Sequence, residues 1–263
     1  MDAARGLLQE FGASKTNISI NEMVPMGSNF NPAVHASFFA NLERAAVDSA
    51  CHSCWASACP PGAVPDAFSG LCYNCGQHDT KGVHGSMSLD GLLTDDGKEL
   101  PRSVWWAYKA YSAVDGTLLV VNGSASADGV AALSADGTTL SAVVGKLGQG
   151  GNTGGSCGPA GSRSDNRTLL RFEGVPVSVL NVAHADTATT LTENTAIVAV
   201  ARIPNSETSP LLSPLVSTQT VATLNHSIVD VELALDNGEV ALVVLGASAE
   251  EVVKSFATSP HAA

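Results

Sequence analysis

The stretch Asn17-Ile18-Ser19-Ile20-Asn21-Glu22 alternates polar and apolar residues, and this alternation predicts a short strand over residues 17–22. Asn31-Pro32 then predicts the start of a helix, because Asn caps helix N-termini and Pro is favoured at the first helical position. Apolar residues at helical spacing extend this helix to about residue 47. A second strand-like stretch runs from Ala50 to Trp55. Strand, helix and strand in succession indicate an α/β region.

The flanking segments complete the first part of the chain. Residues 3–11 have helical apolar spacing, and Gly12 is placed to end that helix. Residues 56–97 are rich in Cys, Pro, Gly and His and predict an irregular segment. Pro101 begins a further helix that ends near Asp115-Gly116. Residues 1–116 therefore form the first predicted domain.

From Thr117 onward the pattern predicts strands and turns. The expected strands are 117–121, 130–133, 140–144, 169–172, 175–182, 196–203, 229–236 and 240–245. Asn237-Gly238 predicts a tight hairpin turn between the last two. Short strands separated by turns are typical of an antiparallel β-sandwich, which we expect over 117–247. Residues 145–166, rich in Gly and Ser, predict a loop, and 248–263 a tail with one short helix.

Composition and charge exclude several classes of function. The chain has 263 residues, 13 Lys and Arg against 25 Asp and Glu, and a formal net charge of −12. Binding to nucleic acid requires a basic surface, so a nucleic-acid partner is not expected. No apolar run has the length of a membrane span.

The cysteines and glycosylation motifs favour an extracellular location. The sequence contains six cysteines and Asn-x-Ser/Thr motifs at Asn17, Asn122, Asn166 and Asn225. The first residues contain no apolar core of signal-peptide length. We therefore expect a secreted protein whose natural N-terminus lies upstream of Met1.

Glu22 is the strongest candidate for a catalytic residue in this pattern. In parallel barrels, catalytic groups lie at the carboxyl ends of strands, and Glu22 ends the strand predicted over 17–22. A carboxylate there can attack an anomeric carbon, and the indole of Trp55, at the end of the next strand, can stack on a sugar. The alternative is that Glu22 is an exposed strand-end carboxylate without a catalytic role.

Two motifs give these residues a family resemblance. Ile18-Ser19-Ile20-Asn21-Glu22-Met23 resembles the nucleophile region on the seventh strand of retaining glycoside hydrolases with a (β/α)8 barrel. The stretch from Ser88 to Gly97, followed by Trp105-Trp106-Ala107-Tyr108-Lys109-Ala110-Tyr111, resembles their approach to the last barrel helix. The resemblance is nearest to glycoside hydrolase family 39, which includes β-xylosidases and α-L-iduronidases, and then to the arabinofuranosidases of family 51. In these enzymes a β-sandwich follows the barrel.

The resemblance implies a role for three residues and a missing partner. Glu22 would be the nucleophile, and Asn21 and Trp55 would bind the sugar. The acid/base carboxyl group of these enzymes lies in an Asn-Glu pair on strand four. Only one strand and two helices separate Asn21-Glu22 from the sandwich, so this pair does not fit strand four. A complete barrel takes about 250 residues, so 1–116 would be the last two strand–helix units.

A fragment of this kind would be inactive alone and would use no metal or organic cofactor. Its partners would be a carbohydrate substrate and either the missing part of the barrel or a second copy of the chain. Two further hypotheses stay open: a non-catalytic protein whose sandwich binds carbohydrate or a partner domain, and an interaction protein built on a zinc ribbon.

The zinc hypothesis rests on cysteine spacing. The pairs Cys51-x2-Cys54 and Cys72-x2-Cys75 match a four-thiolate zinc site. The additional Cys59 and Cys157, and the absence of Lys and Arg between 51 and 80, favour disulfides among Cys51, Cys54, Cys59, Cys72 and Cys75. Zinc binding and free buried thiols remain alternatives, and the pairing is open.

Overall fold

The structure is a computed structural model, and it describes residues 6, 9–12, 17–23, 30–52, 92–93, 98, 100–147, 167–180, 195–206, 209–224 and 227–257. The first part contains β1 (Ser19–Met23), α2 (Pro32–Arg44), β2 (Ser49–His52) and α3 (Ser103–Ser112). The remaining elements are β3 (Thr117–Leu118), β4 (Ala127–Leu133), β5 (Leu140–Lys146), β6 (Arg167–Phe172), α4 (Val177–Leu180), β7 (Thr195–Ile203), β8 (Leu215–Leu224), β9 (Ile228–Ala234), β10 (Val240–Leu245) and α5 (Ala249–Ala257). None of the described helices is long and apolar enough to cross a membrane.

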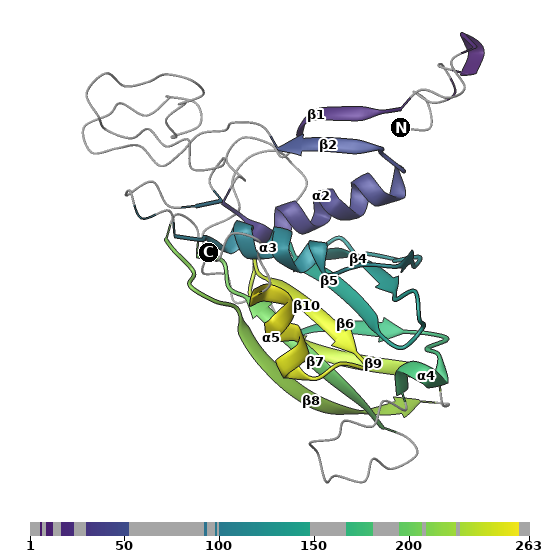
Figure 1. The fold of residues 1–263 in the computed structure, drawn as a ribbon, viewed down its shortest axis with the longest axis vertical. Helices are drawn as coiled ribbons and strands as arrows, with labels where there is room; N and C mark the ends of the chain where they lie inside the picture. The colour runs from purple at the N-terminus through teal and green to yellow at the C-terminus, as the bar shows by residue number, and fades with distance from the viewer. Residues whose placement is uncertain are drawn as a thin grey trace.

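Two sheets of different kind lie on the two sides of α2 (Figure 1). β1 and β2 pair in parallel, as expected for a strand–helix–strand unit. The second sheet is antiparallel and has the strand order β3-β4-β5-β10-β7-β8-β9-β6. Its central strand β10 pairs with both β5 and β7, so that Val240 lies opposite Gly145 on one side and Ile203 on the other.

The central strands of the antiparallel sheet are buried on both faces. Alternate residues Val240, Leu242 and Val244 belong to the core beneath α2, α3 and α5. The intervening residues of β10 belong to a second core, which also contains Phe172 of β6 and Val229 of β9. Because this second core also includes side chains of β4 and β5, the sheet curls around it. Burial on both faces explains why β10 is a continuous apolar run.

The helix α2 has two apolar faces that differ in size. Its small residues Ala33 and Ala36 pack on the antiparallel sheet at Gly145, where an added Cβ would lie 2.7 Å from the carbonyl oxygen of Ala33. On the other side, Phe39 packs against Ile20 of β1 and against the aromatic residues of α3. α2 therefore connects the parallel pair to the antiparallel sheet.

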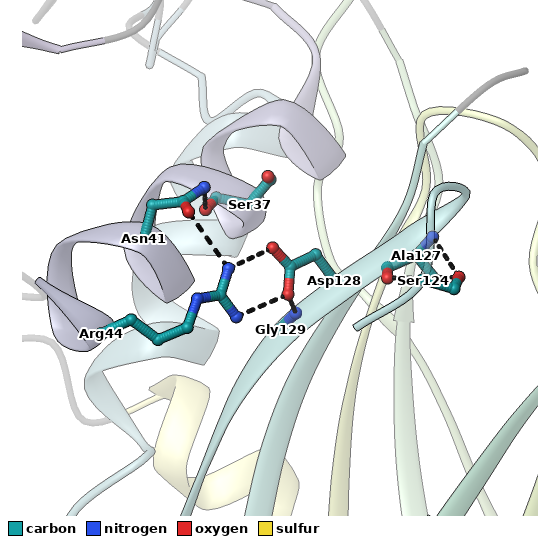
Figure 2. A network of polar contacts seen from close by, with 7 residues as sticks. All are labelled: Ser37, Asn41, Arg44, Ser124, Ala127, Asp128 and Gly129. Carbon is teal, nitrogen blue, oxygen red and sulfur yellow. Dashed lines mark hydrogen bonds and ion pairs between the residues drawn. The ribbon is translucent and has the colours of Figure 1, made fainter. Parts of the chain in front are cut away.

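An ion pair joins the end of α2 to β4 (Figure 2). The two terminal nitrogens of Arg44 donate to the two carboxylate oxygens of Asp128, at 2.9 and 2.5 Å. Asn41 lies beside the pair and accepts a hydrogen bond from Arg44. The carboxylate of Asp128 also accepts from the backbone N–H of Gly129 at 2.8 Å, which fixes its orientation.

Two segments differ in kind from the sequence-based prediction. Residues 175–182 were expected to form a strand, but the structure has the one-turn helix α4 from Val177 to Leu180, directly after Pro176. β8 was not predicted, because its Ser, Thr and Gln residues interrupt the pattern of apolar residues by which a strand is recognised in a sequence. The short helix expected in the tail is confirmed as α5, whose residues Val252 and Phe256 are buried in the core beneath the helices.

Candidate active site

The candidate site lies at the carboxyl ends of β1 and β2. Because the two strands are parallel, these ends meet at one edge of the pair. β2 begins at Ser49, shortly after α2 ends at Arg44, so the amino ends of both strands lie near the C-terminus of α2. The carboxyl ends therefore lie on the side of the α2 N-terminus.

The strand pairing is irregular where Asn21 and Glu22 lie. Ile20 is opposite Ala50 and Met23 is opposite His52, so β1 advances three residues while β2 advances two. One extra residue in one strand is the defining feature of a bulge, and bulges are enriched at barrel rims and beside active sites, where they redirect side chains. Glu22 is thus placed in β1, within this register shift, at the carboxyl edge.

The helix that follows β1 in the chain, α2, is well capped. The side chain of Asn31 accepts hydrogen bonds from the backbone N–H groups of Ala33 and Val34, at 3.0 and 3.3 Å. The N–H of Ala33 also lies 3.3 Å from the carbonyl oxygen of Gly238, in the β9–β10 turn. The N-cap predicted at Asn31 is confirmed, and it holds the start of α2 against the antiparallel sheet.

A buried cation, Arg102, lies on this same side and was not singled out from the sequence. It is 1% exposed, immediately precedes α3, and its guanidinium carbon lies 5.1 Å from the centre of the Phe30 ring. A cation over an aromatic face is attracted to the ring electrons. Phe30 ends the connection that follows Glu22, so Arg102 fixes the end of that connection. The sequence pointed to Arg102 only through its position directly after Pro101, at a predicted helix start.

Glu43, another carboxylate of α2, has a structural role. It lies in the last turn of the helix and accepts a hydrogen bond from the hydroxyl of Tyr111. Burial and this hydrogen bond raise the pKa of Tyr111 above its usual range. Because Glu43 lies at the end of α2 remote from the carboxyl edge, it is not a candidate for acid/base chemistry there.

Most of the other predicted site residues lie outside the described part of the chain. Trp55, Cys54, Cys59, Cys72 and Cys75 belong to this group, and of Cys51 only the backbone position in β2 is described. Disulfide bonding and zinc binding therefore stay predictions. Among the described residues, no group of three or more His, Cys, Asp or Glu side chains is arranged to hold a metal ion.

Comparison with known proteins places this arrangement in a structural class. The sequence matches no family model and no curated protein. The fold matches N2152 from Neocallimastix frontalis with a TM-score of 0.62 at 19% identity, over 94% of this chain and 49% of that one. It matches a glucosidase from Croceicoccus marinus with a TM-score of 0.52 at 13% identity, over 94% and 49% of the two chains. It also matches the GH39 enzyme from Xanthomonas axonopodis pv. citri with a TM-score of 0.51 at 14% identity, over 93% and 47%.

The likeness to the glucosidase and to the GH39 enzyme shows that the fold is glycoside hydrolase-like. The chain spans about half the length of each of these solved structures, and the match includes nearly all of its own residues. The likeness thus extends over both the parallel pair with its helices and the antiparallel sheet.

Proposed function

We propose that this chain is the C-terminal part of a retaining glycoside hydrolase, with Glu22 as its nucleophile. The observation that carries the proposal is the position of Glu22: within a register shift, at the carboxyl edge of a parallel strand pair, in a glycoside hydrolase-like fold. In barrel enzymes the carboxyl edge is where substrate binds. The proposal includes a partial (β/α)8 barrel over residues 1–116 and a β-sandwich over 117–247.

The proposed reaction is a double displacement. The carboxylate of Glu22 attacks the anomeric carbon and forms a glycosyl ester, while the bond from that carbon to the leaving oxygen breaks. A general acid gives its proton to the leaving oxygen. Water then attacks the anomeric carbon, the same acid/base residue takes a proton from the water, and the carboxylate of Glu22 is released. Two inversions give net retention of configuration.

The acid/base residue of this proposal lies outside residues 1–263. Retaining enzymes hold their two carboxyl groups about 5–5.5 Å apart. The resemblance places the second group on strand four of the barrel, which these residues do not include. We therefore propose that residues 1–263 have no hydrolytic activity alone, and that the missing barrel strands complete the site.

Further parts of the proposal concern the substrate and the location of the protein. Asn21 precedes Glu22 in the register shift, and the resemblance assigns it and Trp55 to sugar binding. The nearest family by this resemblance, glycoside hydrolase family 39, suggests a xyloside or a related glycoside. The cysteines and glycosylation motifs support a secreted protein. The proposed chemistry uses carboxyl groups and water, with no metal or organic cofactor.

The test uses the native polypeptide, isolated from its source with an antibody against residues 117–247. We expect a mass well above 26.8 kDa and hydrolysis of an aryl glycoside from a panel of xylosides, glucosides and arabinofuranosides. In the gene of native length, Glu22→Gln should abolish hydrolysis, and azide should restore turnover in Glu22→Ala by replacing the nucleophile.

The matched control is Glu232→Gln, which removes an exposed carboxylate paired with Arg167 at 2.8 Å on the antiparallel sheet. This variant should keep full activity. Undiminished hydrolysis in Glu22→Gln would overturn the proposal. A native polypeptide of 26.8 kDa that hydrolyses no glycoside of the panel would also overturn it and favour a non-catalytic binding protein.

A further inference from the structure

β3 lies at one edge of the antiparallel sheet and exposes apolar side chains there. In the described part of this sheet, β3 has β4 as its single neighbour. The N–H of Leu119 continues the pairing by donating to the carbonyl oxygen of Ala131 at 2.8 Å. Leu118 is 47% exposed and Val120 is 93% exposed. An exposed apolar edge is a template for pairing with another chain, so proteins protect such edges.

The opposite edge of the same sheet is protected by charge. It is formed by β6, which pairs with β9 and carries the exposed residues Arg167 and Arg171. Each of these arginines forms an ion pair at 2.8 Å with a carboxylate of β9, Glu232 or Asp230. Charged side chains on an edge strand oppose pairing with a further strand. Residues 117–127 contain no Asp, Glu, Lys or Arg, so the β3 edge lacks protection of this kind.

Asn122 lies on the same side of the chain as the exposed apolar residues. Val121 packs against the second core, whereas its two neighbours, Val120 and Asn122, are exposed. Side chains alternate in this way along an extended chain, so those of Val120 and Asn122 point away from the core together. Residues two apart in an extended chain are separated by about 6–7 Å. A group attached to Asn122 therefore starts next to Val120.

Asn122 begins the motif Asn122-Gly123-Ser124, which is an acceptor sequence for N-linked glycosylation. All three residues are exposed. The N–H of Ser124 donates to the carbonyl oxygen of Ala127 at 2.8 Å, and the hydroxyl of Ser124 accepts from the N–H of Ala127 at 3.1 Å (Figure 2). A Cβ added at Gly123 would lie 2.6 Å from a carboxylate oxygen of Asp128, so the inner side of this turn is filled. Bulk can be added on the solvent side, where Asn122 lies.

We propose that Asn122 carries an N-linked glycan, which covers Leu118 and Val120 and protects the β3 edge. This inference rests on the secreted location that is part of the proposed function. In the attachment, the amide nitrogen of Asn122 bonds to the anomeric carbon of an oligosaccharide carried on a lipid pyrophosphate. The bond from that carbon to the pyrophosphate oxygen breaks, and the amide nitrogen loses one proton. The glycan is bulky and hydrated, so it occupies the space that a further strand would need.

The first test is peptide mass spectrometry on the native polypeptide. Peptide N-glycosidase removes an N-linked glycan and converts its Asn to Asp, which takes up label when the reaction runs in heavy-oxygen water. We expect the label on the peptide that contains Asn122. In the gene of native length, Ser124→Thr keeps the acceptor motif and should keep the glycan, whereas Ser124→Ala should lose it. An unlabelled Asn122 peptide would overturn the proposal, whether or not the other motifs are labelled.

The second test measures association of the protein of native length by analytical ultracentrifugation. Asn122→Gln should sediment as larger species than the wild type, because its β3 edge is uncovered. Adding Val120→Ser to this variant should restore the wild-type sedimentation. The matched control adds Leu169→Ser instead, which changes an apolar residue that is 60% exposed on the opposite edge strand β6. This control should stay associated. Wild-type sedimentation of Asn122→Gln would overturn the protective role of the glycan.

The failure of this proposal is distinguishable from the failure of the proposed function. Asn122→Gln should hydrolyse the aryl glycoside as fast per molecule as the wild type, because the glycan takes no part in bond breaking. Hydrolysis that requires Glu22, with no label on Asn122, overturns the glycan alone. Label on Asn122, with undiminished hydrolysis in Glu22→Gln, overturns the proposed function and leaves the glycan.

Discussion

The close approach of α2 to the antiparallel sheet at Gly145 predicts that even a methyl group there is destabilising. An added Cβ would lie 2.7 Å from the carbonyl oxygen of Ala33, 2.8 Å from its Cα and 3.0 Å from the Cβ of Ala36. The first two atoms belong to the helix backbone and cannot rotate away. Gly145→Ala therefore requires α2 to move as a body.

The expected loss in the free energy of unfolding follows from two opposing effects. Overpacking a close-packed site costs about 1–3 kcal/mol, whereas replacing Gly by Ala stabilises by about 0.4–1 kcal/mol through the unfolded chain where the site is open. The clash dominates, and we expect a net loss of about 1–2 kcal/mol from these two ranges. For a chain of this size the melting temperature should fall by roughly 2–8 °C.

The assay is urea unfolding followed by tryptophan fluorescence, since Trp105 and Trp106 lie on α3 beside α2. Gly6→Ala is the control, because an added Cβ there meets no atom within 4 Å. The double variant Gly145→Ala with Ala36→Gly should recover little stability, since it relieves only the mildest of the three contacts. Wild-type stability in Gly145→Ala would refute the described docking of α2.

Three further predictions concern charge and cysteine chemistry. Double-mutant cycles on Arg44 and Asp128 should give a coupling free energy of about 0.5–1 kcal/mol for this partly exposed bidentate pair, and this coupling should fall in high salt. A coupling of zero would contradict the described link between α2 and β4. The hydrogen bond from Arg171 lowers the pKa of Asp230. The stability from this pair is therefore present above the usual aspartate pKa and is lost as the pH falls through the lowered pKa. In Arg171→Gln the pKa of Asp230, followed by NMR, should return to its usual range, and an unchanged pKa would contradict the pairing. Alkylation without prior reduction should leave Cys51, Cys54, Cys59, Cys72 and Cys75 largely unmodified if they form disulfides with one another or with Cys157, whereas stoichiometric zinc released by a thiol reagent would contradict that pairing.

The local signals in the sequence were enough to place the elements around the candidate site. Asn31-Pro32 fixes the start of α2 because the capping side chain and the missing N–H act within one turn. Asn237-Gly238 fixes the turn before β10, where Gly238 has a φ of 87° that other residues rarely adopt. These features depend on neighbouring residues only, so the sequence displays them directly.

Features that depend on distant residues could not be predicted in this way. The register shift at Asn21-Glu22 exists only relative to β2, and the need for glycine at position 145 arises from Ala33. α5 was expected as a short helix in the tail, and Ser248 with Glu251 forms its capping box. Its position over β7 and β8, however, depends on tertiary packing. β8 was not predicted because it is a strand through its pairing with β7 more than through the apolar pattern of its own sequence.

Covalent trapping would show directly whether Glu22 is the nucleophile. The protein of native length, incubated with a 2-deoxy-2-fluoroglycosyl fluoride of the sugar that it hydrolyses, should accumulate a glycosyl ester that peptide mass spectrometry detects. We expect the added mass on the peptide that contains Glu22, and we expect it to be absent in Glu22→Gln. An adduct on another carboxylate, or turnover of the glycoside with Glu22 unlabelled, would contradict this expectation.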